Sequence, residues 1–196
     1  MAINSKKELK RFLERDRIAL NKIRKRPKLF GDEIWKLQIL LRRLEYITNR
    51  KQNFLVKLRK MYFKFLFHKM SIKLGVYIPP NCFDEGLSIA HAMCIVVHHN
   101  AKIGKNCRIH EMVNIGATNG SDKAPVIGNN VFIGTGAKII GDVKIADNVV
   151  IGANAVVVHD ILEEGTTWGG VPAKKISNND SKRFINQELN VINGRS

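Results

Sequence analysis

The apolar residues of the first 75 positions recur at the three- and four-residue spacing of amphipathic helices. Ser5 and Glu8 have the spacing of a capping box, and the helix that they begin is expected to run to Pro27, which cannot continue it. Asp32 is a candidate N-cap for a second helix that ends at the polar segment TNRKQN. A third helix is expected from about Phe54 to Leu74.

From about position 95 the apolar residues recur every six positions instead, and a small residue often follows them. A period of six fits neither a helix nor a simple strand, and it is typical of hexapeptide repeats, whose short strands wind a parallel β-helix. Three repeats make one coil of about 18 residues, and successive coils stack about 4.8 Å apart. We therefore predict a mainly β fold, a left-handed parallel β-helix with an N-terminal α-helical module. The residues expected to point into the coil are Val97, Ile103, Ile109, Ile115, Ile127, Ile133, Ile139, Ile145, Ile151 and Val157.

One stretch interrupts the six-residue period. ATNGSDKAP, residues 117–125, is polar and rich in turn-forming residues where another repeat is due. It is predicted to leave the coil as a loop, either as a contact segment or as a tolerated insertion. The chain is thus expected to divide into a helical module (1–75), a β-helix (76–177) with this loop, and a polar C-terminal tail (178–196).

Charge separates the two halves of the chain. Residues 1–75 hold 22 Lys and Arg against 6 Asp and Glu, whereas residues 76–196 hold 11 of each. The helical module is expected either to cap the β-helix and pack on neighbouring subunits or to contact an anionic membrane surface, because its third helix interleaves aromatic and basic residues. No nucleic-acid recognition motif is present, so we expect no nucleic-acid partner.

The chain has no long uncharged apolar run and its first residues, MAINSKKELKRF, lack the apolar core of a signal peptide. A cytoplasmic protein is expected, which its basic module could hold at the inner face of the membrane. Cys82, Cys94 and Cys107 show no CxxC spacing and are expected to be reduced thiols rather than ligands, so no metal is predicted.

Four of the six histidines lie between Ser88 and Gly116. His110 follows His91 by one position more than a full coil, so it is expected on the neighbouring coil beside His91. His98 and His99 follow the inward Val97 at a corner and are expected to be solvated.

The segments GLSIAHAMCIVV, AKIGKNCRIHEMVNIG and GGVPAKKI resemble the left-handed β-helix acyltransferases of the serine acetyltransferase type, over residues 75–177. The resemblance implies a homotrimer, which could pair into a dimer of trimers through its helices. It also implies acetyl-CoA as co-substrate, bound between adjacent β-helices, and direct acetylation of a hydroxyl.

In this resemblance His91 takes the position of the catalytic general base, and His110 is expected to line the site. A neutral imidazole can remove the hydroxyl proton without an acyl-enzyme; acyl transfer through Cys94 and His91 is the alternative. The positions that match acetyl-CoA contacts are Ala117, Gly134, Thr135, Ala153 and Lys174.

The chain departs from the serine enzymes where they hold the amino acid. The acidic partner of the base is replaced by Val76, the acidic residue before the base by Ala90, and a basic-His pair by Lys123 and Ala124. A backbone carbonyl, Asp84 or Glu111 could orient His91 in place of the missing acidic partner. The acceptor-site candidates are therefore Glu111 together with the two changed positions Ala90 and Lys123.

We therefore expect an acetyl-CoA-dependent O-acetyltransferase closest to the polysaccharide-modifying branch, acting on a sugar hydroxyl in polysaccharide biosynthesis. Serine O-acetylation is the alternative within the class, and a non-catalytic hexapeptide scaffold is the alternative outside it.

Overall fold

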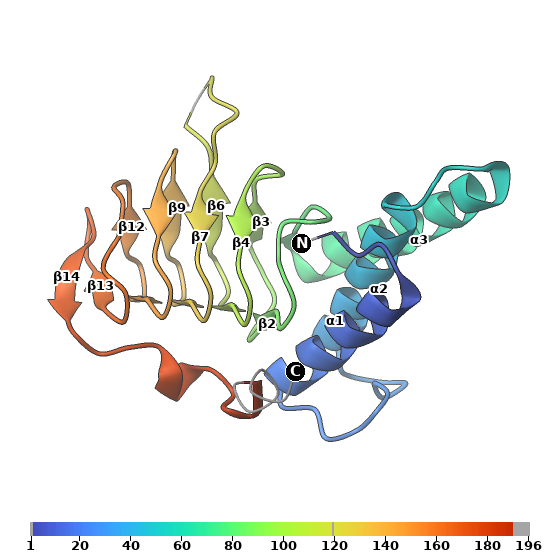
Figure 1. Cartoon of the computed structure of the whole chain (residues 1–196), viewed down its shortest axis with the longest axis horizontal. Coiled ribbons are helices and arrows are strands. Elements are labelled where there is room, and N and C mark those ends of the chain that lie inside the picture. Colours follow the sequence, from blue (N-terminus) through green and yellow to red (C-terminus); the bar gives the residue numbers. More distant parts are fainter. Residues whose placement is uncertain (1, 119, 190–196) are drawn as a thin grey trace.

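The computed structural model describes residues 2–118 and 120–189. A helical module lies at one end and a tapering stack of short strands forms the rest of the molecule (Figure 1). The stack is a left-handed parallel β-helix, as the six-residue period predicts, and the expected fold class is confirmed.

The helical module consists of α1 (Lys6–Ala19), α2 (Glu33–Thr48) and α3 (Phe54–Leu74). The predicted capping box is present, because the Ser5 hydroxyl accepts from the Glu8 N–H and the Glu8 carboxylate accepts from the Ser5 N–H. The bounds of α3 agree with the predicted ones, and the side chain of Asn53 caps its first turn.

Two details of the helices differ from the prediction. The first helix ends at Ala19 rather than near Pro27, because Asn21 adopts a left-handed conformation that breaks the helical hydrogen bonding. Asp32 precedes α2 but does not cap it through its side chain. Its carboxylate instead binds the Lys22 ammonium at 2.5 Å and the Lys28 N–H at 3.0 Å, which holds the α1–α2 connection closed.

The strands form three parallel sheets, one on each face of a triangular prism. One sheet joins β1 (Val76–Tyr77), β3 (Ile95–Val97), β6 (Asn114–Gly116), β9 (Lys138–Ile140) and β12 (Val156–Val157). A second joins β4 (Lys102–Ile103), β7 (Val126–Ile127) and β10 (Lys144–Ile145). The third joins β2 (Ser88–Ile89), β5 (Arg108–Ile109), β8 (Phe132–Ile133), β11 (Val150–Ile151), β13 (Thr167–Gly169) and the antiparallel β14 (Lys174–Ser177).

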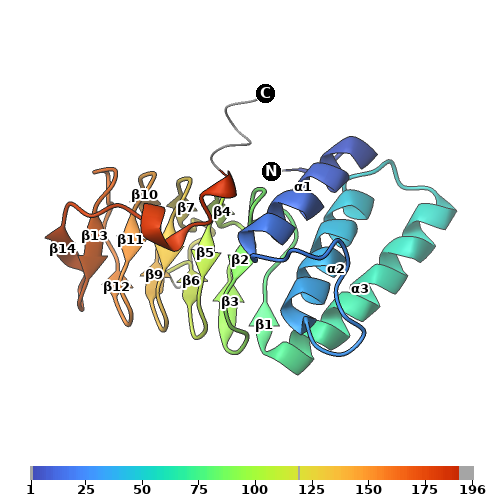
Figure 2. The same ribbon diagram turned by 90° about the horizontal axis from the view of Figure 1, so that it is seen from below.

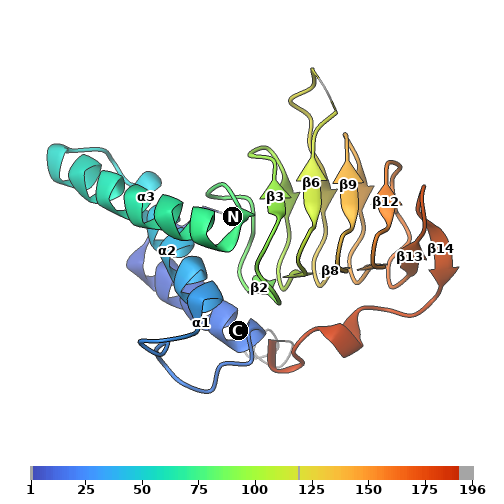
Figure 3. The same ribbon diagram turned by 180° about the vertical axis from the view of Figure 1, so that it is seen from behind.

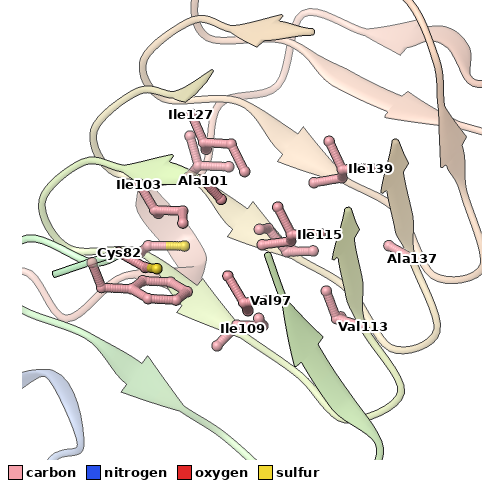
Figure 4. Packing of buried hydrophobic residues seen from close by; sticks show 14 of the residues in the cluster. Cys82, Val97, Ala101, Ile103, Ile109, Val113, Ile115, Ile127, Ala137 and Ile139 are labelled. Atoms are coloured by element: carbon pink, nitrogen blue, oxygen red, sulfur yellow. The ribbon is translucent and has the colours of Figure 1, made fainter. Parts of the chain in front are cut away.

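The core of the prism is a column of stacked aliphatic side chains. Every inward position predicted from the six-residue period is buried, with at most 4% of its surface exposed. Figure 4 shows Val97, Ile109, Ile115 and Ile139 converging in this interior. Burying this apolar surface stabilises each coil only when its neighbours are present, which is why the strands can be two or three residues long.

Residues 117–118 and 120–125 lie outside the strands, in the stretch where the six-residue period is interrupted. This loop connects β6 to β7 and projects beyond the other turns at the top of Figure 1. The coil that contains it, from Ile109 to its pairing partner Ile133, is one hexapeptide longer than the next coil, from Ile133 to its partner Ile151. The loop therefore adds to the repeat without shifting the strands that follow it.

A buried ionic network fastens the helical module to the first coil. The Arg42 guanidinium of α2, fully buried, donates to Asp16 of α1 at 2.7 Å and to Glu45 at 3.0 Å. It also donates to the backbone carbonyls of Phe83 and Asp84 at 2.8 and 2.6 Å. The Asp16 carboxylate in turn accepts from two backbone N–H groups of the coil, so helix and coil share one network.

The segment after β14 returns along the β-helix to α1 (Figure 2). It contains a 3₁₀ helix, Lys182–Phe184, whose Phe184 ring stacks on Phe132 with 4.2 Å between centroids. Ile185 and Leu189 are buried against Ile18 and Ala19 of α1. The described part of the predicted tail is therefore packed.

Helix α3 exposes many apolar side chains. Its end meets the first coil, while its beginning lies far from the β-helix (Figure 3). The helix carries six Lys and Arg and no acidic residue. Among the described residues, no helix is both long and apolar enough to cross a bilayer. The large apolar side chains of α3 that are at least half exposed are Phe54, Leu55, Leu58, Met61, Tyr62, Phe65 and Ile72.

Candidate active site

His91 stands at one corner of the prism, immediately after β2. The strand register stacks this corner, because Ile89, Ile109, Ile133 and Ile151 pair in turn. Two positions after each of them lie His91, Glu111, Thr135 and Ala153, in that order along the axis. The corner is therefore a column of four side chains spaced by about 4.8 Å per coil, with an exposed imidazole at its first level.

His110 lies beside His91, as predicted, with 5.8 Å between ring centroids. The strand register here differs from that of a regular coil of three hexapeptides. Ile89 pairs with Ile109, so the first coil on this face is two residues longer than a regular coil. The added residues lie between Ile89 and Val97, a segment that is two residues longer than the segment from Ile109 to Ile115 with which it pairs. His110 consequently pairs with Ala90, and the residue opposite His91 is Glu111.

Glu111 supplies the carboxylate next to the two imidazoles. One of its oxygens accepts from the Thr135 hydroxyl at 2.9 Å, and the other lies 3.8 Å from His110 Nδ1. The pKa of Glu111 is lowered by its own backbone N–H and by the Thr135 hydroxyl. An ionised carboxylate so placed can orient a neighbouring imidazole and stabilise its protonated form.

Asp84, the other acidic residue considered for this role, is directed elsewhere. Its side chain accepts from the Glu85 N–H at 2.8 Å, and its carbonyl accepts from Arg42 in the buried network. Val76, which stands where a preceding acidic partner was sought, is buried in the apolar interior. The structure therefore places the carboxylate on the coil that follows His91, not on the one before it.

The surroundings of His110 favour its neutral form. Burial lowers its pKa, and the nearby Arg108 guanidinium and His91 lower it further, against the opposing effect of Glu111. The edge of its ring faces Phe132 with 5.1 Å between centroids. A neutral imidazole can accept a hydrogen bond from a substrate or donate one to it, so His110 fits a position that lines the site.

Three of the predicted acetyl-CoA positions lie along this corner. Gly134, Thr135 and Ala153 are on adjacent coils, and a side chain at Gly134 would come within 2.8 Å of the Ala153 backbone nitrogen. Lys174 pairs with Gly169 in the terminal hairpin, at the end of the same sheet. Ala117 instead follows β6 and lies at a different corner, so a single chain does not bring it together with the other four.

The thiols of Cys82 and Cys107 play no part in this site. Both are buried, and burial raises the pKa of Cys82 to about 11 and that of Cys107 further still. Cys94 is exposed, three residues from His91, but within the described part of the chain no hydrogen bond joins the two. A cysteine nucleophile therefore has no support from the geometry.

Two imidazoles and a carboxylate are a donor set that suits zinc. Donor atoms of His91, His110 and Glu111 lie within 4.8 Å of one another. A metal there would occupy the lone pair that a general base needs, and Thr135 already holds the Glu111 carboxylate. We therefore treat these three residues as a proton-transfer site rather than as a metal centre.

The remaining candidates lie away from the column. The rings of His98 and His99 contact each other at a tilt of 34°, with 4.3 Å between centroids. His99 is exposed as expected, whereas His98 is half-buried and accepts from the Asn100 N–H at 3.2 Å. Lys123 forms an ion pair at 2.9 Å with Asp142 rather than with a group of the site.

Arg108, which the repeat pattern did not single out, lies beside this site. It is the first residue of β5, precedes His110 by two positions and lines a pocket beside Ala90. Side chains two apart on a strand share a face, so the spacing Arg-Ile-His within KNCRIHEM was the available signal.

Comparisons with known proteins bear on the fold and on the class of enzyme. The bacterial transferase hexapeptide family (six repeats) matches residues 124–159. The chain is 39% identical over 106 residues to a serine acetyltransferase of Helicobacter pylori strain J99, a match that covers 53% of this chain and 61% of that protein. The chain spans between 47% and 61% of the length of the curated relatives that it matches.

Solved structures of serine acetyltransferases share the fold. The enzyme of Neisseria gonorrhoeae in complex with serine is 30% identical with a TM-score of 0.64, covering 86% of this chain and 69% of that one. The enzyme of Brucella abortus in complex with coenzyme A is 25% identical with a TM-score of 0.70, covering 89% and 70%. These proteins are described as serine acetyltransferases, and no polysaccharide-modifying enzyme is among them, so the expected polysaccharide branch is not supported.

Proposed function

We propose that this chain, which carries bacterial transferase hexapeptide repeats and shares the fold of serine acetyltransferases, transfers the acetyl group of acetyl-CoA to the hydroxyl of L-serine. The observation that carries the proposal is the exposed His91 at the head of the corner column, beside Glu111 and His110. The structures with serine and with coenzyme A supply the two substrates by analogy.

The chemistry takes place in one active site without an acyl-enzyme. His91 accepts the proton of the serine hydroxyl as its oxygen attacks the thioester carbonyl and a C–O bond forms. The Glu111 carboxylate stabilises the resulting imidazolium. When the C–S bond breaks, the imidazolium returns its proton to the departing thiolate, giving O-acetylserine and coenzyme A. Buried hydroxyl or thiol nucleophiles are not required.

Acetyl-CoA would bind along the corner column, starting from His91. Thr135 and Ala153 are small side chains on successive coils, and Lys174 lies where the same sheet ends. Small residues let an extended pantetheine chain approach the backbone closely, and a basic residue suits nucleotide phosphates. The co-substrate would thus extend from the first coil toward the terminal hairpin.

The acceptor is tested by thiol release from acetyl-CoA. We expect release that depends on L-serine, at a rate that saturates with serine concentration. Matched reactions with neutral hexoses and with N-acetylhexosamines serve as controls for a sugar acceptor. Release that requires a sugar and ignores serine would contradict the serine assignment, and absence of release with any acceptor would favour a scaffold.

Replacement of Glu111 by Gln is expected to lower kcat by roughly tenfold to a thousandfold, because an opposite charge within about 4–6 Å stabilises a protonated group by one to three pKa units. The KM for acetyl-CoA should change little. Since the Glu111 pKa is lowered, its carboxylate is charged throughout pH 6–8, so the effect of its charge is present at an assay pH of 7. Initial rates measure this, with the exposed Glu164→Gln as the matched control. An unchanged kcat for the Glu111 variant would exclude the role.

The expected homotrimer and the expected contact with an anionic membrane remain predictions. A single chain leaves an apolar patch uncovered next to the site, formed by Tyr77, Met93, Val96 and Met112. Tyr77 pairs with Val96, and the Met112 N–H donates to the Met93 carbonyl, so these residues are contiguous. Patches of this kind suit subunit contacts, whereas the basic and apolar surface of α3 suits an anionic surface.

A further inference from the structure

A pocket of about 510 Å³ lies between the helical module and the first coil, next to His91. Ala90 and Ala92, the two residues that flank His91, form part of its wall together with Ser88 and Arg108. The other side is formed by the α1–α2 connection and the start of α2, including Lys22, Asp32 and Glu33.

Arg108 is a half-buried cation without an acidic partner. Its described hydrogen bond is to the Ser88 hydroxyl at 3.2 Å, and it forms no ion pair within the part of the chain that the structure describes. Burial without a counter-charge lowers its pKa. A guanidinium carries five N–H donors arranged to bind a carboxylate in two places, so most of its binding capacity is unused.

Arg42, in contrast to Arg108, has a hydrogen-bond partner for each of its donor groups. Arg42 pairs with two carboxylates and two backbone carbonyls. Leaving a partly desolvated guanidinium unpaired costs free energy in the empty protein, and an anionic ligand would recover that cost.

The spacing between Arg108 and the two imidazoles suits a small hydroxy acid. Arg108 begins β5 and His110 directly follows it, on the same face of the sheet, so their Cα atoms lie about 6.5–7 Å apart. His110 pairs with Ala90, so His91 is adjacent. A carboxylate bound at Arg108 would leave a hydroxyl two carbons away within reach of the imidazoles.

We propose that Arg108 binds the carboxylate of the acceptor and that the pocket selects a zwitterionic amino acid. The inference rests on the proposed function and deepens it. The Asp32 carboxylate in this pocket is already bound to Lys22, whereas Glu33 has its nearest described cation, Lys36, at 3.9 Å, so Arg108 and Glu33 are the cationic and anionic groups left to a ligand. That charge distribution fits an ammonium and a carboxylate on one small molecule, and it fits a phosphate or a dicarboxylate poorly.

This assignment also accounts for the departures at Ala90 and Lys123. The methyl group of Ala90 leaves the pocket open beside the base, and the Lys123 ammonium is paired with Asp142. The two charges that bind the amino acid would thus come from β5 and from the start of α2, not from the loop or from the residue before His91.

The test compares Arg108→Gln with Arg108→Lys and with Lys102→Gln, an exposed cation of β4 as the matched control. Loss of a charged hydrogen-bonded pair weakens the binding free energy by about 1.5–3 kcal/mol, which corresponds to a roughly 10- to 150-fold weaker affinity. We expect the KM for serine to rise by that factor in the Gln variant, to be partly restored by Lys, and to be unchanged in the control. The kcat at saturating serine and the KM for acetyl-CoA should change little.

Serinamide, which lacks the carboxylate, and 3-hydroxypropionate, which lacks the ammonium, identify the recognised groups. Wild-type enzyme should prefer serine to serinamide in kcat/KM, and Arg108→Gln should lose that preference. Equal preference in both proteins would overturn the inference while leaving serine acetylation intact.

Calorimetric titration of L-serine into wild type and Arg108→Gln reports binding without turnover. Binding to wild type that weakens at least tenfold in the variant supports the inference, even if the proposed acetylation fails. Equal binding to both, or no binding to wild type, overturns it. Thermal unfolding of Arg108→Lys confirms that the pocket still folds when the position remains cationic.

Discussion

Replacement of His91 by Ala should lower kcat for acetyl transfer by about 10²- to 10⁴-fold, because general-base catalysis by a positioned imidazole contributes that much. Hydroxyl protons are not removed at neutral pH without such a base, and the two neighbouring titratable groups, whose pKa values are lowered, are weaker bases. Glu111 is hydrogen-bonded to Thr135, and the pKa of His110 is lowered by burial and by Arg108. Initial rates of thiol release at saturating serine and acetyl-CoA measure the effect.

Two controls separate a catalytic loss from a structural one. His99→Ala removes an exposed histidine of the same segment and should retain the wild-type rate. Acetyl-CoA binding to His91→Ala, followed by calorimetry, should be preserved because the Thr135 and Ala153 levels of the column are unaltered. A His91→Ala protein with more than a tenth of the wild-type kcat would place the general base elsewhere.

Replacement of Arg42 by Met should lower the free energy of unfolding by about 3–5 kcal/mol, because it leaves the buried carboxylates of Asp16 and Glu45 without their cation. The network joins α1, α2 and the first coil, so the loss should appear as one cooperative destabilisation. Urea unfolding at pH 7 measures it, with Arg43→Met, an exposed arginine of the same helix, expected to change stability by no more than about 0.5 kcal/mol.

The pH dependence of the Arg42 variant supplies a further check. Burial raises the pKa of Glu45, and Arg42 opposes that rise. Without Arg42 the folded-state pKa of Glu45 should rise further above its value in the unfolded chain, so the folded variant binds more protons. The free energy of unfolding of the variant should then increase as the pH falls from 7 to 5. The difference in free energy of unfolding between wild type and variant, the stability gap, should become smaller. A gap independent of pH would mean that the carboxylates find other partners.

The β-helix could be predicted because its signal is repeated. Each inward aliphatic is specified by position alone, and the ten that the period selects are all buried. The helix that ends at Ala19 shows the limit of a local pattern. Apolar spacing continues toward Pro27, but the left-handed Asn21 and the contact between Lys22 and Asp32 fix the chain path there.

The candidate site could be predicted only in part. His91 and His110 were expected to be neighbours, and the structure confirms it. Their register was not predictable, because Met93 and Cys94 adopt left-handed conformations that lengthen the first corner without a glycine to signal it. That corner places Glu111, rather than His110, opposite the base.

Arg108 lay outside the prediction for a different reason. Its pocket is formed where the α1–α2 connection meets the first coil, and these segments lie far apart in the chain. No repeat or motif connects them. Only the packing of the helical module on the coil, fixed by Arg42, brings Asp32 and Glu33 to the same cavity as Arg108.

The mass of the product formed from acetyl-CoA and isotope-labelled L-serine decides whether His91 catalyses serine acetylation. We expect O-acetylserine, with one acetyl group on the serine oxygen, from wild type and from His99→Ala. His91→Ala should form it at no more than about a hundredth of that rate, the lower bound of general-base catalysis. Formation of labelled O-acetylserine at equal rates by wild type and His91→Ala, or its absence from the wild-type reaction, would contradict the proposed function.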